Sequence, residues 1–321
     1  MIQKLLGYYR RIPKRVTSVL FIIAVVVFLV LYLKDTDFGR LRHLHIDWWL
    51  LLAASAWTLA FRYWMVLIWR VILRALGSEH LPPFRVMSYV YAKAWLSRYI
   101  PGTVTWIAAR IYMASSYGIS KSRLMVSSLL EGAMQVAAST IVSMIILGLN
   151  PHFDLVPLVA KVLVVIVSII SLVVLFPPIF NRLMYIAFSV FKRQPNRDLH
   201  INGKAVGWSF VLFAIGTFIN GTGAFLLILS IDPTTSLATY LYIIGAFGIS
   251  GAIGIAVPFL PSGLGVRDGI LLVLLAAIMP KEVALVVTVF SRLWLMAIDV
   301  LFLGAAAGVK HLKADDHPEK V

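Results

Sequence analysis

Long apolar stretches separated by short polar segments dominate this chain. Six of them approach the roughly 20 residues that a helix needs to cross a bilayer. They lie at residues 16–33, 48–69, 122–148, 155–176, 205–230 and 282–308. This pattern predicts an all-α integral membrane protein with six full transmembrane helices.

Two further regions, residues 84–116 and 237–279, combine apolar sequence with prolines, glycines and charges. Each is predicted to form two shorter helices that meet at a turn, because 84–100 is too polar and 264–279 too short for a full span. Broken elements are tolerated inside a membrane when protein shields them or when they line a wet cavity. We therefore favour two re-entrant hairpins over two ordinary kinked helices. The predicted turn residues are Pro101, Gly102, Pro258, Pro261, Gly263 and Gly265.

The composition supports a membrane protein and excludes a soluble fold. Only 13% of the residues are charged, whereas soluble domains have about a quarter. The net charge of +15 does not indicate nucleic-acid binding, because the basic residues cluster between apolar spans, where they set topology and contact anionic headgroups. The absence of cysteine excludes disulfides, zinc–thiolate sites and thiol catalysis.

The distribution of Lys and Arg predicts that both termini are cytoplasmic, in a plasma or inner membrane. The outside segments carry 4 basic residues. The inside segments carry 18, and they are residues 1–15, 70–85, 117–123, 177–204 and 309–321. We expect a basic N-terminus at 1–15, one membrane domain at 16–308 and a polar tail at 309–321.

The two halves of the chain, at about 48–148 and 205–308, share the order span, broken region, span. By the charge count the first half begins outside and the second inside, so the sequence predicts an inverted-topology repeat, which is a common transporter plan. The two hairpins would then enter from opposite faces and meet near the midplane. At an offset of 160 residues the coincidences are Trp48 with Trp208, Pro101 with Pro261, and Lys121 with Lys281.

Ten charged side chains lie inside the predicted membrane regions and away from the first two residues of each region, so each needs a partner or water. Three of them, Arg62, Lys93 and Lys161, are expected to reach an interface. The remaining basic residues are candidates to bind a lipid phosphate, and they are Arg98, Arg110, Arg267 and Arg292. The acids are candidates for ion pairing or proton coupling, and they are Glu131, Asp268 and Asp299.

Two of these candidates lie where a half-helix should begin. Arg267 and Asp268 follow Gly265, and the free N–H groups and positive dipole of a helix start favour an anion. Asp268 is expected to satisfy that dipole, to pair with an arginine or to accept a headgroup amine. Glu131 and Arg292 occupy near-equivalent repeat positions, so we expect an ion pair between them that holds the halves together or contacts the ligand.

The chain resembles the lysylphosphatidylglycerol synthase transmembrane-region family, the flippase-like domain also found at the N-terminus of MprF-type proteins. The resemblance is carried by RYIPGTV at 98–104, by Glu131, and above all by PFLPSGLGVRDG at 258–269, although the family commonly has Glu at the position of Asp268. It covers nearly the whole chain and implies a role in moving lipids between leaflets. The soluble synthase domain of the two-domain relatives is expected to be absent, because a short polar tail ends the sequence.

Three functions follow from these features. The first is a flippase that moves an anionic phospholipid or lipid-linked phosphate through a central cavity between the hairpins, without ATP because no GxxxxGK[ST] motif occurs. The second is a non-transporting partner subunit of a lipid- or envelope-synthesis enzyme. The expected protein partners are such an enzyme or further copies of the same chain. The third, an enzyme, is disfavoured, because no cluster of acids and no buried His–carboxylate pair is predicted. We expect neither a metal nor a cofactor.

Overall fold

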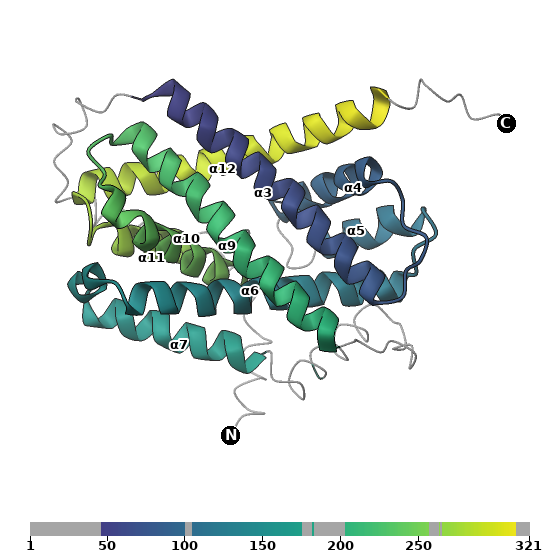
Figure 1. Ribbon diagram of the computed structural model, residues 1–321, viewed down its shortest axis with the longest axis horizontal. Coiled ribbons are helices and arrows are strands. Elements are labelled where there is room, and N and C mark those ends of the chain that lie inside the picture. The colour runs from purple at the N-terminus through teal and green to yellow at the C-terminus, as the bar shows by residue number, and fades with distance from the viewer. Residues whose placement is uncertain are drawn as a thin grey trace, which may run out of the picture. The chain divides into compact units, whose positions relative to one another are not determined.

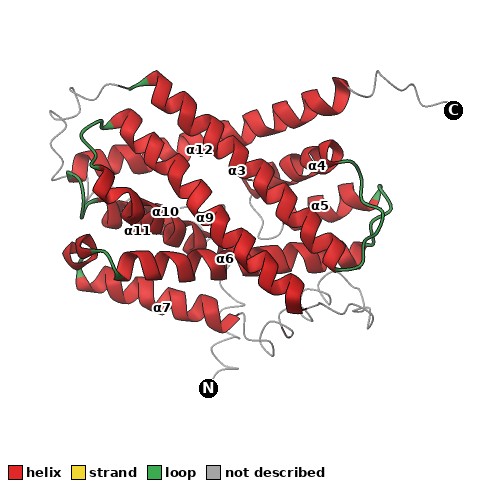
Figure 2. Ribbon diagram, in the orientation of Figure 1, coloured by secondary structure: helices red, strands yellow, loops and turns green. Residues whose placement is uncertain are grey.

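The computed structural model describes residues 46–99, 105–174, 203–256 and 265–312, together with Arg182 and Gly263. Every regular element in these ranges is a helix, and Figure 2 shows helices joined by short connections. The α-helices are α3 (Trp48–Ala75), α4 (Phe84–Leu96), α5 (Thr105–Ser115), α6 (Lys121–Gly148), α7 (Leu158–Val174), α9 (Gly203–Ile231), α10 (Tyr240–Ala256), α11 (Val266–Leu275) and α12 (Lys281–Leu312). Short 3₁₀ turns are η2 (Ser97–Tyr99), η3 (Pro151–Leu155) and η4 (Leu237–Thr239).

Within the described ranges, 5 helical segments are long and apolar enough to cross a membrane. Four of them, in α3, α6, α9 and α12, are helices where the sequence predicts spans, and the fifth is Leu237–Ala256. The predicted span at 155–176 contains α7, which is described over 17 residues, and the last residue of the 3₁₀ turn η3 begins this stretch. Residues 175–176 lie outside the described residues. The predicted first span at 16–33 lies outside the described residues. The protein is therefore a multi-pass helical membrane protein.

Local sequence sets both ends of α3. The carboxylate of Asp47 accepts hydrogen bonds from the N–H groups of Trp49 and Leu50 at 2.9 and 3.1 Å, which satisfies donors that a helix start leaves free. The helix ends before Gly77, whose φ of 80° is a left-handed conformation that favours glycine. The 28 residues between these signals are long enough to cross the bilayer.

Helices α3 and α9, the first spans of the two halves, pack side by side and run antiparallel (Figure 1). The N–H of Asp47, at the start of α3, donates to the carbonyl of Ser230 near the end of α9 at 2.8 Å. Farther along, the indole of Trp64 donates to the carbonyl of Leu212 at 3.0 Å. Opposite directions for these two helices are what the predicted inverted repeat requires.

The first broken region forms an antiparallel hairpin of α4 and α5. The Thr105 hydroxyl, at the start of α5, donates to the Ser97 carbonyl just beyond α4 at 2.7 Å. One turn away from the tip, the rings of Trp95 and Trp106 pack edge to face at 6.1 Å. Both arms, of 13 and 11 residues, are shorter than a membrane span, as predicted. The predicted turn residues Pro101 and Gly102 lie outside the described residues.

The second broken region forms an antiparallel hairpin of α10 and α11. The Tyr242 hydroxyl, near the start of α10, donates to the Leu274 carbonyl near the end of α11 at 2.9 Å. At the other end the arms touch closely, because a Cβ on Gly263 would lie 2.5 Å from the Cα of Gly254. Positive φ angles at Gly263 (66°) and Gly265 (83°) confirm that this turn needs glycine. Pro258 and Pro261 lie outside the described residues.

The connections at the two ends of the first hairpin lie together. A Cβ on Gly77, before α4, would be 3.5 Å from the guanidinium of Arg123, which follows α5. The chain therefore leaves this hairpin on the side where it entered.

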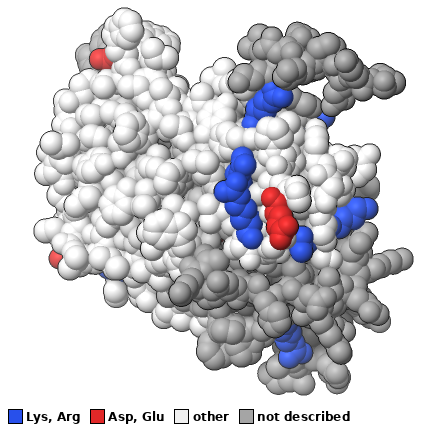
Figure 3. Space-filling model, turned by 45° about the vertical axis from the view of Figure 1, so that its right-hand side comes forward, with Lys and Arg blue, Asp and Glu red and all other residues white. Residues whose placement is uncertain are grey.

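Basic side chains gather around one acidic side chain on a face of the molecule whose other described surface is largely uncharged (Figure 3).

Close packing of α9 on α10 generates a stability prediction. A Cβ on Gly221 would lie 2.9 Å from the Cα of Ile244, so Gly221→Ala must push the two helices apart. We expect the substitution to lower the free energy of unfolding by about 1–3 kcal/mol, measured by thermal unfolding in detergent. The control is Gly132→Ala on α6, where a Cβ meets nothing within 4 Å. Equal melting temperatures for the two variants would contradict the packing described.

Candidate ligand cavity

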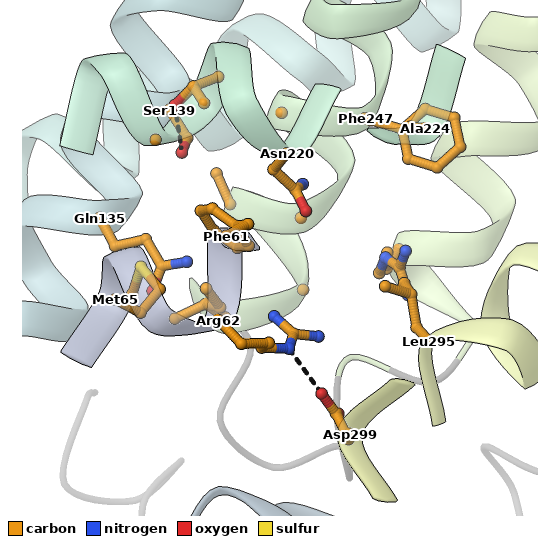
Figure 4. A pocket seen from close by; sticks show the side chains of 18 of the residues that line it. Phe61, Arg62, Met65, Gln135, Ser139, Asn220, Ala224, Phe247, Leu295 and Asp299 are labelled. Carbon is orange, nitrogen blue, oxygen red and sulfur yellow. Dashed lines mark hydrogen bonds and ion pairs between the residues drawn. The ribbon is translucent and has the colours of Figure 1, made fainter. Parts of the chain in front are cut away.

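A cavity of about 110 Å³ opens between the two hairpins and the long helices. Its wall includes residues of α3, α6, α9 and α12, the tip of the first hairpin and both arms of the second. A buried water molecule needs roughly 10–15 Å³ of such space, so the cavity can hold several. Figure 4 shows that polar side chains from different helices point into it.

Four arginines line this cavity, and they come from four different elements. Arg62 lies on α3, Arg98 in η2 at the first hairpin tip, Arg267 on α11 and Arg292 on α12. Asp299 is the only carboxylate among the lining residues that the structure describes. The cavity is therefore strongly cationic, which favours an anionic ligand.

Asp299 joins the two halves of the chain. The Arg62 Nε donates to its Oδ1 at 2.6 Å (Figure 4). The Tyr99 hydroxyl donates to its Oδ2 at 2.6 Å. The side chains of Arg62 and Asp299 are only 7% and 1% exposed, so this is a buried ion pair rather than an interfacial one. The expectation that Arg62 reaches an interface is wrong, because α3 packs this position against α12.

Asp268 fastens the second hairpin to α12. Its Oδ2 accepts from Arg292 at 2.6 Å and from the N–H of Gly265 at 3.2 Å. The same carboxylate thus satisfies the start of α11 and pairs with an arginine, which are two of the three roles expected from the sequence. The pair is about one-fifth exposed, with 19% for the Arg292 side chain and 21% for Asp268, and of the two residues Arg292 lines the cavity.

Arg267 differs from the other cavity arginines. It has no hydrogen bond or ion pair to the described part of the chain, although it is half-buried and its Cβ packs against Gly254. Arg98 lies at the other hairpin tip, with its guanidinium 4.4 Å from the centre of the Trp95 ring. Both hairpin tips therefore bring an arginine to the same cavity, as the predicted opposition of the tips requires.

Arg110 and Glu131 form a separate buried pair outside the cavity. Arg110, on α5, is 0% exposed and donates to both carboxylate oxygens of Glu131, on α6, at 2.5 and 3.4 Å. The Tyr91 hydroxyl of α4 donates to the same carboxylate at 2.7 Å. Neither member of the pair lines the cavity, so this pair ties the first hairpin to α6.

Three aromatic rings surround the Arg110 guanidinium. Its central carbon lies 4.9 Å from the ring centre of Trp69, 4.3 Å from that of Tyr91 and 4.9 Å from that of Trp106. Cation–π contacts of this kind stabilise a desolvated guanidinium by about 2 kcal/mol or more. Together with Glu131 they balance the charge that the fold buries here.

The predicted ion pair between Glu131 and Arg292 is wrong. Each of these residues pairs within its own half, Glu131 with Arg110 and Arg292 with Asp268. In both halves the partner lies on the second arm of the hairpin and the pair joins that arm to the next long helix. In the first half the arginine lies on the hairpin arm and the acid on the long helix, whereas in the second half the acid lies on the arm and the arginine on the long helix. The two pairs are therefore equivalent in position, with acid and base interchanged.

Sequence reasoning missed several cavity residues that carry uncharged polar groups. Gln135 on α6 and Asn220 on α9 direct their amides toward the space beside Arg62 (Figure 4). Both lie well inside predicted spans, as does Arg62 on α3. Polar residues far from either end of an apolar helix are the signal that could have identified them, because the membrane interior disfavours them without a function.

A buried ion pair that loses one partner leaves an uncompensated charge. We therefore expect Arg110→Ala to lower the free energy of unfolding by about 3–5 kcal/mol, measured by thermal or denaturant unfolding in detergent. The double variant Arg110→Met with Glu131→Leu should recover part of this loss, because no buried charge remains. A double variant as unstable as the sum of the two single variants would contradict direct pairing.

The all-helical membrane fold agrees with a comparison to protein families. The family model described as "Lysylphosphatidylglycerol synthase TM region" matches residues 16–302. No curated protein matches the chain. The match includes both hairpins, the three arginine–carboxylate pairs and every described residue that lines the cavity. The chain belongs to the lysylphosphatidylglycerol synthase transmembrane-region family.

Proposed function

We propose that this protein moves a lipid with an anionic phosphate headgroup between the leaflets of the membrane. One observation carries the proposal: four arginines from separate elements line one central cavity, and a single described carboxylate lines it with them. Buried charges in membrane proteins mark substrate or ion pathways, and a surplus of positive charge selects an anion. The family is consistent with a lipid-related role.

The headgroup would enter the cavity while the acyl chains stay in the surrounding lipid. In this proposal the hairpins are re-entrant, and their tips carry Arg98 and Arg267 to the phosphate near the midplane. Alternating access would come from movement of one half against the other, as in other inverted repeats. The Arg62–Asp299 and Tyr99–Asp299 contacts join the halves, so these contacts would break or rearrange when the cavity changes sides.

Leaflet exchange in proteoliposomes tests the proposal. We expect the wild-type protein to accelerate exchange of a fluorescent anionic phospholipid, and Arg267→Ala to slow it roughly tenfold or more, because a charge-assisted contact is lost. The matched control is Lys161→Ala, which removes a basic residue of α7 that pairs with Asp154 at 3.6 Å outside the cavity.

Three outcomes are decisive. No exchange of any lipid, with or without an ion gradient, would overturn the flippase proposal and favour a non-transporting partner subunit. Exchange that Arg267→Ala leaves unchanged would overturn the assignment of the cavity. Equal slowing by Arg267→Ala and Lys161→Ala would show that the effect follows net charge rather than position.

Sidedness is part of the same proposal and has its own test. The chain has no cysteine, so single cysteines can be placed at the exposed positions Glu79, before α4, and Lys281, at the start of α12. An impermeant thiol reagent applied to intact cells should label Lys281→Cys and spare Glu79→Cys. Labelling of both from one side would contradict the inverted arrangement.

A further inference from the structure

The cavity has a second polar region that the proposed phosphate site does not use. It is a group that we call the amide–hydroxyl wall, made of Gln135 and Ser139 on α6 and Thr217 and Asn220 on α9. None of these side chains carries a charge. Figure 4 shows the amides of Gln135 and Asn220 directed into the same space as the Arg62–Asp299 pair.

The hydroxyls of the wall are held in place by the protein. The Thr217 hydroxyl bonds to the Phe213 carbonyl at 3.1 Å and lies 3.1 Å from the Ser139 hydroxyl. Helix α10 approaches them closely because Gly248 has no side chain, and a Cβ there would lie 3.0 Å from the Thr217 methyl group. The wall is therefore a packed surface rather than a loose collection of polar groups.

The amides of the wall, in contrast, have no partner among the residues that the structure describes. Across the described ranges, neither Gln135 nor Asn220 makes a side-chain hydrogen bond. An unsatisfied amide away from bulk water costs free energy comparable to a lost hydrogen bond. Both amides also sit inside helices long and apolar enough to cross the membrane. Their partners must come from water or from a ligand in the cavity.

The carboxylates near the cavity are already engaged. Both oxygens of Asp299 accept short hydrogen bonds, from Arg62 and from Tyr99. Asp268 pairs with Arg292 and caps α11. A ligand ammonium group would therefore find no available lining carboxylate among the described residues, and it would face a surplus of guanidinium groups.

These observations rest on the proposed function and narrow its substrate. We infer that the cavity takes a headgroup that joins a phosphate to a small, uncharged polyol, with the phosphate at the arginines and the hydroxyls at the amide–hydroxyl wall. Phosphatidylglycerol has this chemistry. Its lysyl ester adds positively charged ammonium groups to this headgroup. The inference therefore disfavours the lysyl ester as a ligand, even though the family name refers to it.

Equilibrium binding of short-chain lipids to the purified full-length protein tests this inference. The probes are phosphatidylglycerol, phosphatidic acid, which has the phosphate without the polyol, and lysylphosphatidylglycerol. The variants are Asn220→Leu and Gln135→Met, which remove an amide with little change in volume, and Arg267→Ala. The control is Thr222→Val on α9, whose hydroxyl bonds to the Phe218 carbonyl and to Tyr240 outside the cavity.

We expect Asn220→Leu and Gln135→Met each to weaken phosphatidylglycerol binding between about two- and tenfold, the range of a neutral hydrogen bond, and to leave phosphatidic acid binding unchanged. Arg267→Ala should weaken both by about tenfold or more. The wild-type protein should bind the lysyl ester at least about tenfold more weakly than phosphatidylglycerol. Thr222→Val should change neither affinity.

Four results would overturn the inference. They are lysyl-ester binding as tight as phosphatidylglycerol binding, equal losses for both anionic lipids in the amide variants, no loss in either variant, and no binding of phosphatidylglycerol to the wild type. Melting temperatures of the variants identify any that fail to fold, and the second amide variant then decides.

The expected binding pattern without leaflet exchange would overturn the proposed transport and leave this inference standing. Leaflet exchange without the expected binding pattern would overturn this inference and leave the proposed transport standing.

Discussion

Placing guanidinium groups inside a membrane protein costs several kcal/mol for each group that lacks compensation, and this constraint organises the structure. Three of the buried or half-buried arginines satisfy it with carboxylates, namely Arg62, Arg110 and Arg292. Arg110 receives three aromatic rings in addition to its acid. Arg110 and Arg292 each pair across two consecutive helices, whereas Arg62 pairs with Asp299 from the other half of the chain. The buried charges therefore help to determine which helices meet.

The same pairs explain why a cavity persists between the hairpins. In each half, one ion pair ties the second hairpin arm to the long helix that follows, with acid and base exchanged between the halves. A third pair, between Arg62 and Asp299, joins the halves directly. Described residues of both hairpins line the cavity, and it also contains polar groups that these pairs leave unused, among them Arg267.

The sequence predicts the helical architecture better than it predicts which charged side chains contact each other. Hydropathy and glycine placement identified the long helices and both broken regions, because apolar length and Gly-rich turns are local properties. Partner choice is not local. Glu131 and Arg292 were expected to pair because they occupy equivalent repeat positions, but each found an opposite charge on its neighbouring hairpin arm. The sequence does not reveal that Arg62 faces Asp299, because this contact joins opposite halves of the chain. It does not single out Asn220 either, because a single amide scarcely alters hydropathy.

The central claim is that the cavity between the hairpin tips holds a lipid phosphate beside Arg267. Electron cryo-microscopy of the protein in nanodiscs of anionic phospholipid tests it most directly. The account predicts phosphate density within hydrogen-bonding distance of the Arg267 guanidinium, continuous with acyl-chain density that leads to the surrounding bilayer. Lipid phosphates confined to the two bilayer surfaces, with only water beside Arg267, would contradict it.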